Sequence, residues 1–367
     1  MTTATHNLAS AGTLTPSAPA EFVETARQCF EQAAVAAGGV RERYFQLGEQ
    51  TVLLRFAGDQ LVPLMVRALA HLEEPSPVRQ PDLTVCFFDS ESTGTPMAPP
   101  PWSGEQYTNL GEIDGYNNGQ VHVTYTPGVD ILHCLDRQRG LAVYWTPTFR
   151  LIPWWEQSFP LRSILNWWLR DEPFQPAHAA AVGRPSGGVL ITGPSGTGKS
   201  TSTLACLGSE LQYAGDDYVL IRTDPSPFVF SLYSTAKLEA DNLARFPNLA
   251  PLVSNAERLD REKALIYLHE HHPSRLIKGF PIRALVIPKV TGLPHTTIET
   301  ISPAAALLAL APTTTKHLLG TRRETVEKLM RLVKAVPSYR LLAGTDLAQI
   351  PAAISSLLDS LNPSGAR

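Results

Sequence analysis

Hydrophobic and polar residues in the first 150 positions alternate over short segments, which is the pattern of half-buried β-strands. Two of these segments, 43–47 and 51–56, are separated by a turn at Gly48 and predict a β-hairpin. Apolar residues spaced three to four apart predict helices over 21–37 and 60–72. Further strands are predicted over 83–88, 121–126, 131–135 and 141–145.

This pattern predicts an α+β domain of antiparallel strands over residues 21–150, flanked by segments of different composition. Residues 1–20 are rich in Thr, Ala, Ser and Pro and lack the layout of a secretory signal, so we expect a disordered leader. Residues 151–171 are dense in tryptophan, and their apolar residues have helical spacing. We interpret them as an amphipathic connector helix at the seam between two domains, because such an aromatic stripe more often packs in a core than stacks on bases.

The pattern after residue 172 mixes strands and helices, which indicates an α/β domain over 172–367. The run 282–287 is almost continuously apolar, as expected of a strand buried in a sheet. Thr321 is expected to cap the N-terminus of a helix that ends at Ala335, with Glu324 completing a capping box. Other strands are predicted over 189–192, 228–233 and 264–268 and at Leu341, and helices over 238–245 and 347–361.

Composition narrows the class of protein. The chain has 367 residues, 43% of them hydrophobic, and a formal net charge of −3. This charge provides no basic field for nucleic acid or for an anionic membrane surface. The sequence contains no run of about 18 apolar residues, so no membrane-spanning helix is predicted. The four cysteines are scattered without a Cys-x-x-Cys pair, so we expect reduced thiols in a cytoplasmic protein.

Residues 193–200 read Gly-Pro-Ser-Gly-Thr-Gly-Lys-Ser and match the phosphate-binding P-loop pattern. Glycines let backbone N–H groups converge on an anion without Cβ clashes, and the start of the following helix adds partial positive charge. Lys199 can reach the β- and γ-phosphates of ATP, and the Ser200 hydroxyl can bind Mg²⁺. The predicted nucleotide-binding residues are Gly193, Ser195, Gly196, Thr197, Gly198, Lys199, Ser200 and Thr201.

Phosphoryl transfer also needs a carboxylate for the metal ion and an oriented nucleophile. An adjacent strand is expected to end at Asp216 and Asp217, two neighbouring carboxylates that point in opposite directions. One of them can hold Mg²⁺ beside Ser200 while the other addresses a substrate hydroxyl. A hairpin over 184–187 would bring His178 to the phosphate end of the sheet, although a structural role fits its spacing equally well.

His178, the P-loop and the aspartate pair together resemble the catalytic domain of the HPr kinase/phosphorylase superfamily. The resemblance covers residues 175–222 well and the rest of the second half loosely. It implies a P-loop kinase fold related to that of phosphoenolpyruvate carboxykinase, in a family whose members often form homo-oligomers. By position, it implies that Lys199 binds the β- and γ-phosphates and that Ser200 and Asp217 hold Mg²⁺. Asp216 would then act as the base toward the acceptor hydroxyl, and His178 would support the phosphoryl site.

The chain departs from that superfamily outside the motif. The glycine-rich segment that carries a family glutamate is replaced by 232–239, in which Lys237 or Glu239 could serve. Arg283 matches a late family arginine only by its position in a strand. The first half does not look like that of true HPr kinases. The similarity is therefore closer to the HPr-kinase-like proteins that accompany bacterial biosynthetic clusters.

We therefore expect an ATP- and Mg²⁺-dependent kinase that phosphorylates a hydroxyl of a peptide, a protein or a small molecule. One alternative is a nucleotide-gated binding module that consumes no acceptor. Another is a carboxykinase-like enzyme that acts on a carboxylate substrate, which needs extra basic residues and usually a second metal site. The remaining histidines are expected to be solvated or satisfied rather than ligands, including His122 and His133 on predicted strands and His269, His271 and His272 in a polar stretch.

Overall fold

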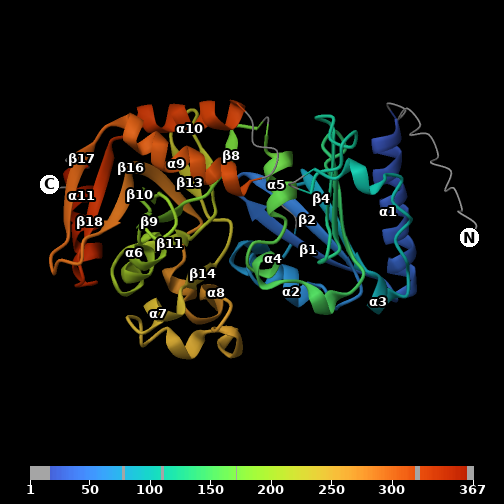
Figure 1. Ribbon diagram of the computed structural model, residues 1–367, viewed down its shortest axis with the longest axis horizontal. Helices are drawn as coiled ribbons and strands as arrows, with labels where there is room; N and C mark the ends of the chain where they lie inside the picture. Colours follow the sequence, from blue (N-terminus) through green and yellow to red (C-terminus); the bar gives the residue numbers. More distant parts are fainter. Residues whose placement is uncertain (1–16, 77–78, 109–110, 171, 319–322, 362–367) are drawn as a thin grey trace, which may run out of the picture.

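A computed structural model describes residues 17–76, 79–108, 111–170, 172–318 and 323–361 of the chain. Figure 1 shows two sheet-based lobes side by side, with two short helices between them. Within the described residues, the first lobe (18–146) contains a seven-stranded sheet. The second lobe (174–361) contains a nine-stranded sheet and a separate two-stranded sheet. The protein is thus a mixed α/β structure built on several sheets.

The sheet of the first lobe has the strand order β3-β1-β2-β4-β7-β6-β5. Its strands are β1 Val40–Leu47, β2 Gln50–Ala57, β3 Glu73–Glu74, β4 Leu83–Asp89, β5 Val121–Thr126, β6 Ile131–Asp136 and β7 Leu141–Thr146. The predicted hairpin of β1 and β2 is confirmed. The expectation of a wholly antiparallel sheet is wrong, because β4 pairs in parallel with both β2 and β7. Parallel pairs need long crossovers, and the segments 58–82 and 90–140 supply them.

Helix α1 (Ala18–Ala36) covers one face of this sheet, where Phe22, Val23 and Phe30 are buried in a core with Phe88. The helix begins earlier than predicted, so residues 18–20 belong to it and not to a disordered leader. Proline is tolerated in a first helical turn because its missing N–H has no helical partner there. Pro19 therefore starts this helix instead of preventing it. Residues 1–16 of the expected leader lie outside the described residues.

The segment 60–72 forms helix α2 (Val62–Val66) and a 3₁₀ turn at Ala70–Leu72 instead of one continuous helix. Its apolar residues are nevertheless buried under the opposite face of the first sheet. The segment after β4 contains a short helix, α3 (Ser90–Thr93), whose N-terminus is capped by the Asp89 carboxylate accepting from the Ser92 N–H.

The tryptophan-rich connector forms two helices, α4 (Trp154–Ser158) and α5 (Arg162–Trp168), where a single amphipathic helix was expected. They are separated at Leu161, whose φ is 64°. Helix α5 is buried at every position from 163 to 168, so it has no solvent-facing polar side. The reason is that both lobes pack on it: Trp167 shares one core cluster with Tyr144 of the first lobe and Tyr218 of the second.

The large sheet of the second lobe is mixed, with β16 at its centre. Strand β16 (Gly279–Val290) pairs in parallel with β10 (Gly187–Ile191) and β18 (Ser338–Ala343). Its first residues pair antiparallel with β13 (Phe228–Phe230). The remaining strands of the sheet are β8 Phe174–Ala177, β9 Ala180–Arg184, β11 Gln212–Gly215, β12 Val219–Arg222 and β17 Thr297–Ile301.

Helices cover both faces of this sheet (Figure 1). Helices α9 (Pro303–His317) and α10 (Arg323–Ala335) pack on the face that presents Leu190 and Leu285. Helices α6 (Lys199–Ala205) and α11 (Gln349–Leu361) pack on the opposite face. The small sheet of β14 (Thr235–Leu238) and β15 (Ala264–Tyr267) lies beside α6, near the short helices α7 (Ala240–Leu243) and α8 (Leu268–His271).

Several predicted elements of the second lobe are displaced or missing. The predicted helix over 238–245 shrinks to α7, because Leu238 ends strand β14. Strand β17 was not predicted, and its side chains are mostly exposed on the sheet edge. Helix α9 was not predicted either, and Pro312 inside it is a helix-breaking signal in the sequence. The predicted cap Thr321 lies outside the described residues.

None of the helices in the described part of the chain combines the length and the apolar character needed to cross a lipid bilayer.

Candidate functional site

The site is built at one edge of the large sheet, where β10 ends. Strands β9 and β10 pair antiparallel with Ala180 opposite Ile191, which confirms the predicted hairpin over 184–187. His178, two residues before β9, therefore lies at the same sheet edge as the loop that leaves β10. This edge faces the connector helices and the first lobe in Figure 1.

The loop over 192–198 depends on glycine. Gly193 and Gly198 have φ values of 142° and 101°, in the region that side chains disfavour. A Cβ at Gly198 would also lie 3.2 Å from Cγ2 of Val290. The loop is fixed to the sheet by the Thr192 N–H, which donates to the Val286 carbonyl at 3.0 Å. The motif thus adopts a compact turn that other residues would strain.

Lys199 is the first residue of α6, and its side chain is buried against the loop. Its Nζ donates to the carbonyls of Gly193 at 2.8 Å and Pro194 at 3.2 Å. Burial lowers the pKa of this ammonium, and the charges of Asp217 and Asp216 oppose that shift. The loop tip at Ser195 is exposed to solvent. The structure therefore places one cation beneath an accessible, glycine-containing loop.

Asp216 and Asp217 directly follow β11, which is not the strand beside β10 as expected, because β9 lies between them. Strands β10 and β11 are both antiparallel to β9, so both end at the same edge of the sheet. The aspartates consequently lie at the same end of the sheet as the loop over 192–198, despite the intervening strand. Asp217 has a φ of 65°, which is uncommon for a residue with a side chain and is often found at functional sites.

Asp216 is fully buried. Its Oδ1 accepts the Asp217 N–H at 3.0 Å. Its Oδ2 is also buried and has no hydrogen-bond partner within the described residues. Burial, together with the neighbouring Asp217 charge, raises the pKa of Asp216 to about 7, while the Ser200 hydroxyl and the Lys237 ammonium oppose that rise. A buried carboxyl of this kind can take up a proton near neutral pH.

Asp217 is held between two basic side chains from different segments. The Lys237 Nζ lies 2.7 Å from its Oδ2, and the His178 Nε2 lies 3.6 Å from its Oδ1. Burial on its own would raise the pKa of Asp217, but Lys237 and His178 outweigh burial and hold the pKa well below its usual range. Asp217 is therefore a carboxylate at all ordinary pH values.

Aromatic rings surround these charges. The Lys237 ammonium lies 4.2 Å from the centre of the Phe159 ring and 5.2 Å from that of Trp154, both in the connector. The His178 ring contacts Tyr218 edge-on at 5.4 Å between centres. The backbone N–H of His178 donates to Thr314 Oγ1 at 3.2 Å. The connector thus forms a wall of the site.

The structure separates Lys237 and Glu239, the two residues that were expected to serve in the segment 232–239. Lys237 meets the aspartate pair, whereas Glu239 forms an ion pair with Lys263 at 2.8 Å. Arg283 does not join the site. Its guanidinium donates to the Ser186 carbonyl, beside the start of β10, and the five residues of β10 separate that point from the loop by roughly 13 Å.

The other histidines have separate environments. His122 is buried and stacks on Trp167 at 5.2 Å. His133 is buried and lies 3.6 Å from the Glu156 carboxylate. Of the two environments expected for these histidines, solvated or satisfied inside the fold, neither is the solvated one. His269 and His271 belong to helix α8. Within the described residues, no group of three or more His, Cys, Asp or Glu side chains could hold a metal ion on its own.

Two residues beside the site were missed by sequence reasoning. Arg162 Nη1 donates to the Tyr218 hydroxyl at 3.0 Å, and Tyr218 directly follows the aspartate pair. Adjacency to the pair was a usable signal for Tyr218. Arg162 is 54 positions earlier than Asp216 in the chain, and no motif connects the two.

The donors present suit Mg²⁺ with a nucleotide phosphate. Mg²⁺ prefers oxygen ligands and is commonly held by one or two carboxylates together with phosphate oxygens and water. The unpartnered Oδ2 of Asp216 is a buried oxygen with free acceptor capacity. Asp217 and the half-buried Ser200 add a second carboxylate and a hydroxyl. Few protein oxygens are available here, so a Mg²⁺ ion at this site would take its other ligands from phosphate and water.

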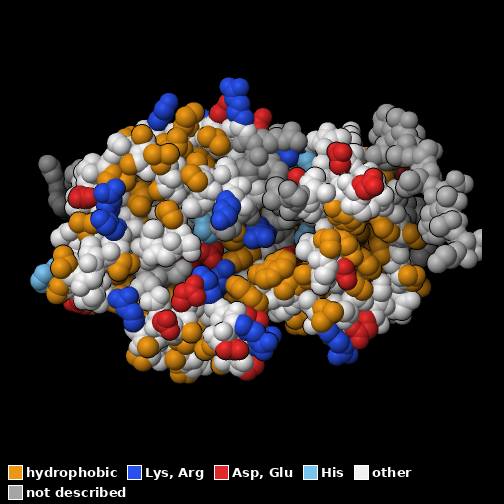
Figure 2. Space-filling view, in the orientation of Figure 1, with side chains coloured by type: hydrophobic (Ala, Val, Ile, Leu, Met, Phe, Trp, Pro, Cys, Tyr) orange, Lys and Arg blue, Asp and Glu red, His pale blue; other side chains and the backbone are white. Residues whose placement is uncertain are grey.

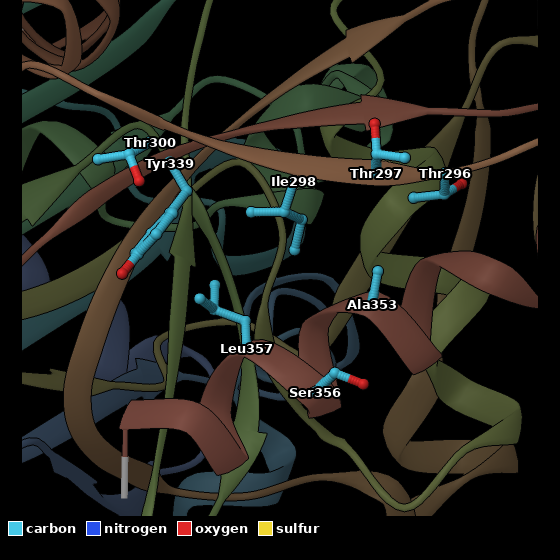
Figure 3. Close-up of a pocket in the computed structure, with 8 residues that line it drawn as sticks. All are labelled: Thr296, Thr297, Ile298, Thr300, Tyr339, Ala353, Ser356 and Leu357. Atoms are coloured by element: carbon cyan, nitrogen blue, oxygen red, sulfur yellow. The ribbon is translucent and has the colours of Figure 1, made fainter.

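Figure 2 shows basic, acidic and histidine side chains gathered between the lobes, next to an apolar patch. A separate cavity of about 460 Å³ lies on the outer side of the second lobe. Figure 3 shows the residues that line it, which are Thr296, Thr297, Ile298, Thr300, Tyr339 and, on α11, Ala353, Ser356 and Leu357. None of the predicted site residues lines this cavity.

Comparisons with known proteins assign no family. No protein-family model and no curated protein matches the chain. Among solved structures, one that matches is the HPr(Ser) kinase/phosphatase from Coxiella burnetii. It is 13% identical, and the match covers 51% of this chain and 95% of that chain with a TM-score of 0.28. A TM-score this low identifies neither the family nor the activity of the chain.

Proposed function

We propose that the protein is an ATP- and Mg²⁺-dependent phosphotransferase that phosphorylates a hydroxyl group. The observation that carries this proposal is the convergence of Lys199, His178 and the aspartate pair at one sheet edge, around a glycine-dependent loop with the P-loop sequence. Asp216 is buried and Asp217 is partly buried. A structural turn needs neither two such carboxylates nor a lysine beneath it. Burying such charges costs free energy that a purely structural role does not return.

Different residues have different proposed roles in phosphoryl transfer. The loop amides over 193–201 and the Lys199 ammonium bind the nucleotide phosphates. Mg²⁺, when bound, would be held by Ser200 and Asp217 and would neutralise phosphate charge. The contacts of Asp217 with Lys237 and His178 support that role, because they keep Asp217 ionised as a metal ligand must be.

Asp216 is the proposed base, and its pKa of about 7 is suited to exchanging a proton near neutral pH. The acceptor hydroxyl gives its proton to Asp216, and its oxygen forms a bond to the γ-phosphorus. The bond from the γ-phosphorus to the β–γ bridging oxygen breaks, and ADP leaves with that oxygen. His178 supports the site through Asp217, with which it forms an ion pair when protonated.

The acceptor is proposed to be a hydroxyl-bearing peptide, protein or small molecule. We also propose a cytoplasmic location, because all four cysteines are free thiols buried in the fold.

Binding of an ATP analogue by calorimetry and transfer from labelled ATP test the proposal. Lys199→Ala should abolish both, while Lys334→Ala, an exposed lysine on α10, should change neither. Asp216→Asn should retain nucleotide binding and lose transfer. Undiminished ATP binding by Lys199→Ala would refute the P-loop assignment. Transfer unchanged in Asp216→Asn would refute its role as base, and ATP binding with no acceptor consumed would indicate a nucleotide-gated binding module instead.

A further inference from the structure

Arg162 places a positive charge in the seam between the lobes. It is the first residue of α5, and its Nη1 donates to the Tyr218 hydroxyl at 3.0 Å. Its Cζ lies 5.4 Å from the centre of the Tyr218 ring. Among the described residues no carboxylate forms an ion pair with it, and Tyr218 is its one hydrogen-bond partner. The other guanidinium nitrogens, Nε and Nη2, have no hydrogen-bond partner within the described residues and are accessible to solvent.

Tyr218 connects this guanidinium to the reacting groups. Tyr218 follows Asp217 in the chain, and its ring contacts His178, which in turn lies beside the Asp217 carboxylate. Phe159 also packs against the Tyr218 ring, with 4.8 Å between the ring centres, and the Lys237 ammonium lies over the Phe159 ring. A group bound to Arg162 would therefore lie one tyrosine ring away from the aspartate pair.

Two further polar groups near Arg162 have unused hydrogen-bonding capacity. The hydroxyl of Tyr144, on β7, is buried and has no hydrogen-bond partner within the described residues. The buried Oε1 of Glu156, on α4, also accepts no hydrogen bond there, and it lies 3.6 Å from the Nε2 of His133. The Glu156 charge acts on both Arg162 and Tyr144, which places the three side chains in one cluster. Buried polar groups are normally hydrogen-bonded, so the surroundings of Arg162 are polar and incompletely hydrogen-bonded.

A purely structural explanation for Arg162 fits these contacts poorly. The Glu156 charge acts on Arg162 from a distance, but the Glu156 carboxylate lies beside His133, and it forms no ion pair with Arg162 within the described residues. A guanidinium has five N–H donors in a planar fork, and Tyr218 uses one of them. The unused fork suits the two oxygens of a carboxylate or a phosphate.

We infer that Arg162 binds an oxyanion on the acceptor, so that the acceptor is a small hydroxyl compound carrying a carboxylate or a phosphate. This inference rests on the proposed phosphotransferase function. The phosphates of the nucleotide have their own binding groups in the P-loop and Lys199, which leaves the Arg162 fork for the second substrate. A small compound fits better than a folded protein, because Arg162 is only partly exposed and its guanidinium lies against the buried Tyr218.

Matched pairs of small alcohols test this inference. Glycerate and glycerol 3-phosphate carry a carboxylate and a phosphate, and glycerol carries neither. Each is offered to the full chain with Mg²⁺ and labelled ATP, and its binding is measured as a shift in Tm in the presence of Mg²⁺ and a non-hydrolysable ATP analogue. The variants are Arg162→Gln and Arg162→Lys. The control is Arg150→Gln, an exposed arginine next to the connector whose partner is Glu91.

Wild type should bind at least one of the two acids more tightly than glycerol. Arg162→Gln should weaken the binding of that acid by roughly tenfold or more and leave binding of the ATP analogue unchanged. Arg162→Lys should be intermediate, because lysine keeps the charge but lacks the fork. Arg150→Gln should behave as wild type. Preference for the carboxylate or for the phosphate then tells which oxyanion the acceptor carries.

Two results would overturn the inference: neither acid is preferred over glycerol by wild type, or Arg162→Gln keeps the wild-type preference. Circular dichroism of both Arg162 variants shows whether they fold. If Arg162→Gln does not fold, the inference is tested with Arg162→Lys alone. Failure of wild type to bind the ATP analogue would instead count against the proposed function, so the two failures are distinguishable.

Discussion

The ammonium of Lys237 lies 2.7 Å from the Oδ2 of Asp217, and both side chains are largely buried, at 12% and 18% exposure. Lys237 belongs to the small sheet, whereas Asp217 follows the edge strand of the large sheet. Phe159 of the connector packs against the same ammonium. One ion pair therefore connects three parts of the fold at the candidate site.

Breaking this pair should be costly. Lys237→Met leaves the Asp217 carboxylate buried beside His178 alone, and loss of one partner of a buried pair costs about 3 kcal/mol of unfolding free energy. The double variant Lys237→Met/Asp217→Asn removes both charges and should recover part of that loss, with a coupling energy of about 1–3 kcal/mol. Asparagine is suitable at position 217 because it tolerates the positive φ. The free energies of unfolding of wild type, Lys237→Met and the double variant are measured by urea unfolding.

The pair of Lys278 and Glu74 is a matched control, since it has the same 2.7 Å separation but exposures of 62% and 30%. Lys278→Met should cost less than about 1 kcal/mol, because solvent screens exposed pairs. Equal losses for Lys237→Met and Lys278→Met would show that burial of the first pair has no energetic consequence.

Gly198→Ala should damage the loop. The substitution forces a side chain into a φ of 101°, at a cost of about 1–2 kcal/mol, and brings its Cβ to 3.2 Å from Val290. We expect binding of an ATP analogue to weaken by about tenfold. Gly208→Ala is the control, because a Cβ there meets no atom within 4 Å. Calorimetry that finds equal affinity for Gly198→Ala and wild type would contradict the argument from loop geometry.

His71 should make stability pH-dependent. Its Nε2 hydrogen-bonds the Ser231 hydroxyl across the two lobes at 2.6 Å. Burial lowers the pKa of His71 to about 3, and the charges of His269 and Lys278 add to that shift. The unfolded chain, with a pKa of 6.5, takes up the proton more readily than the folded one. The contribution of His71 to stability is therefore fully present above pH 6.5 and is lost as pH falls from 6.5 toward 3, by at most about 1.4 kcal/mol per pH unit.

Urea unfolding of His71→Gln across this pH range checks the effect. The variant should show a shallower loss of stability between pH 6.5 and 3 than wild type. His295→Gln changes an exposed histidine and should keep the wild-type slope. Parallel curves for wild type and His71→Gln would rule out a titration of His71 linked to folding.

The buried thiols should react slowly in the native protein. Burial raises the pKa of both Cys86 and Cys206 to about 12. The thiolate is the reactive form, so little of it exists at pH 8. Ellman's reagent should label both residues slowly in buffer and quickly in denaturant, as mass spectrometry of the labelled peptides would show. Rapid native labelling of Cys206 would place it outside the core.

Local patterns predicted the elements of this protein better than their pairing. The hairpin of β1 and β2 and the turn between β9 and β10 follow from alternation and glycine, which act within a few residues. The parallel pairing of β4 depends on crossovers that no local pattern encodes. Trp167 shows the same limit: its segment has helical spacing, but burial on all sides follows from both lobes packing on it.

By itself, the sequence determined the chemistry available at the candidate site. It supplies a loop with glycines where φ is positive, a lysine at the end of that loop, and two adjacent carboxylates at the end of a later strand. Tertiary structure decided which side chains meet them. Lys237 pairs with Asp217 and Arg162 reaches Tyr218 because strands and helices distant in sequence end at one sheet edge. Contacts of this kind depend on packing between elements, and residue spacing along the chain does not specify them.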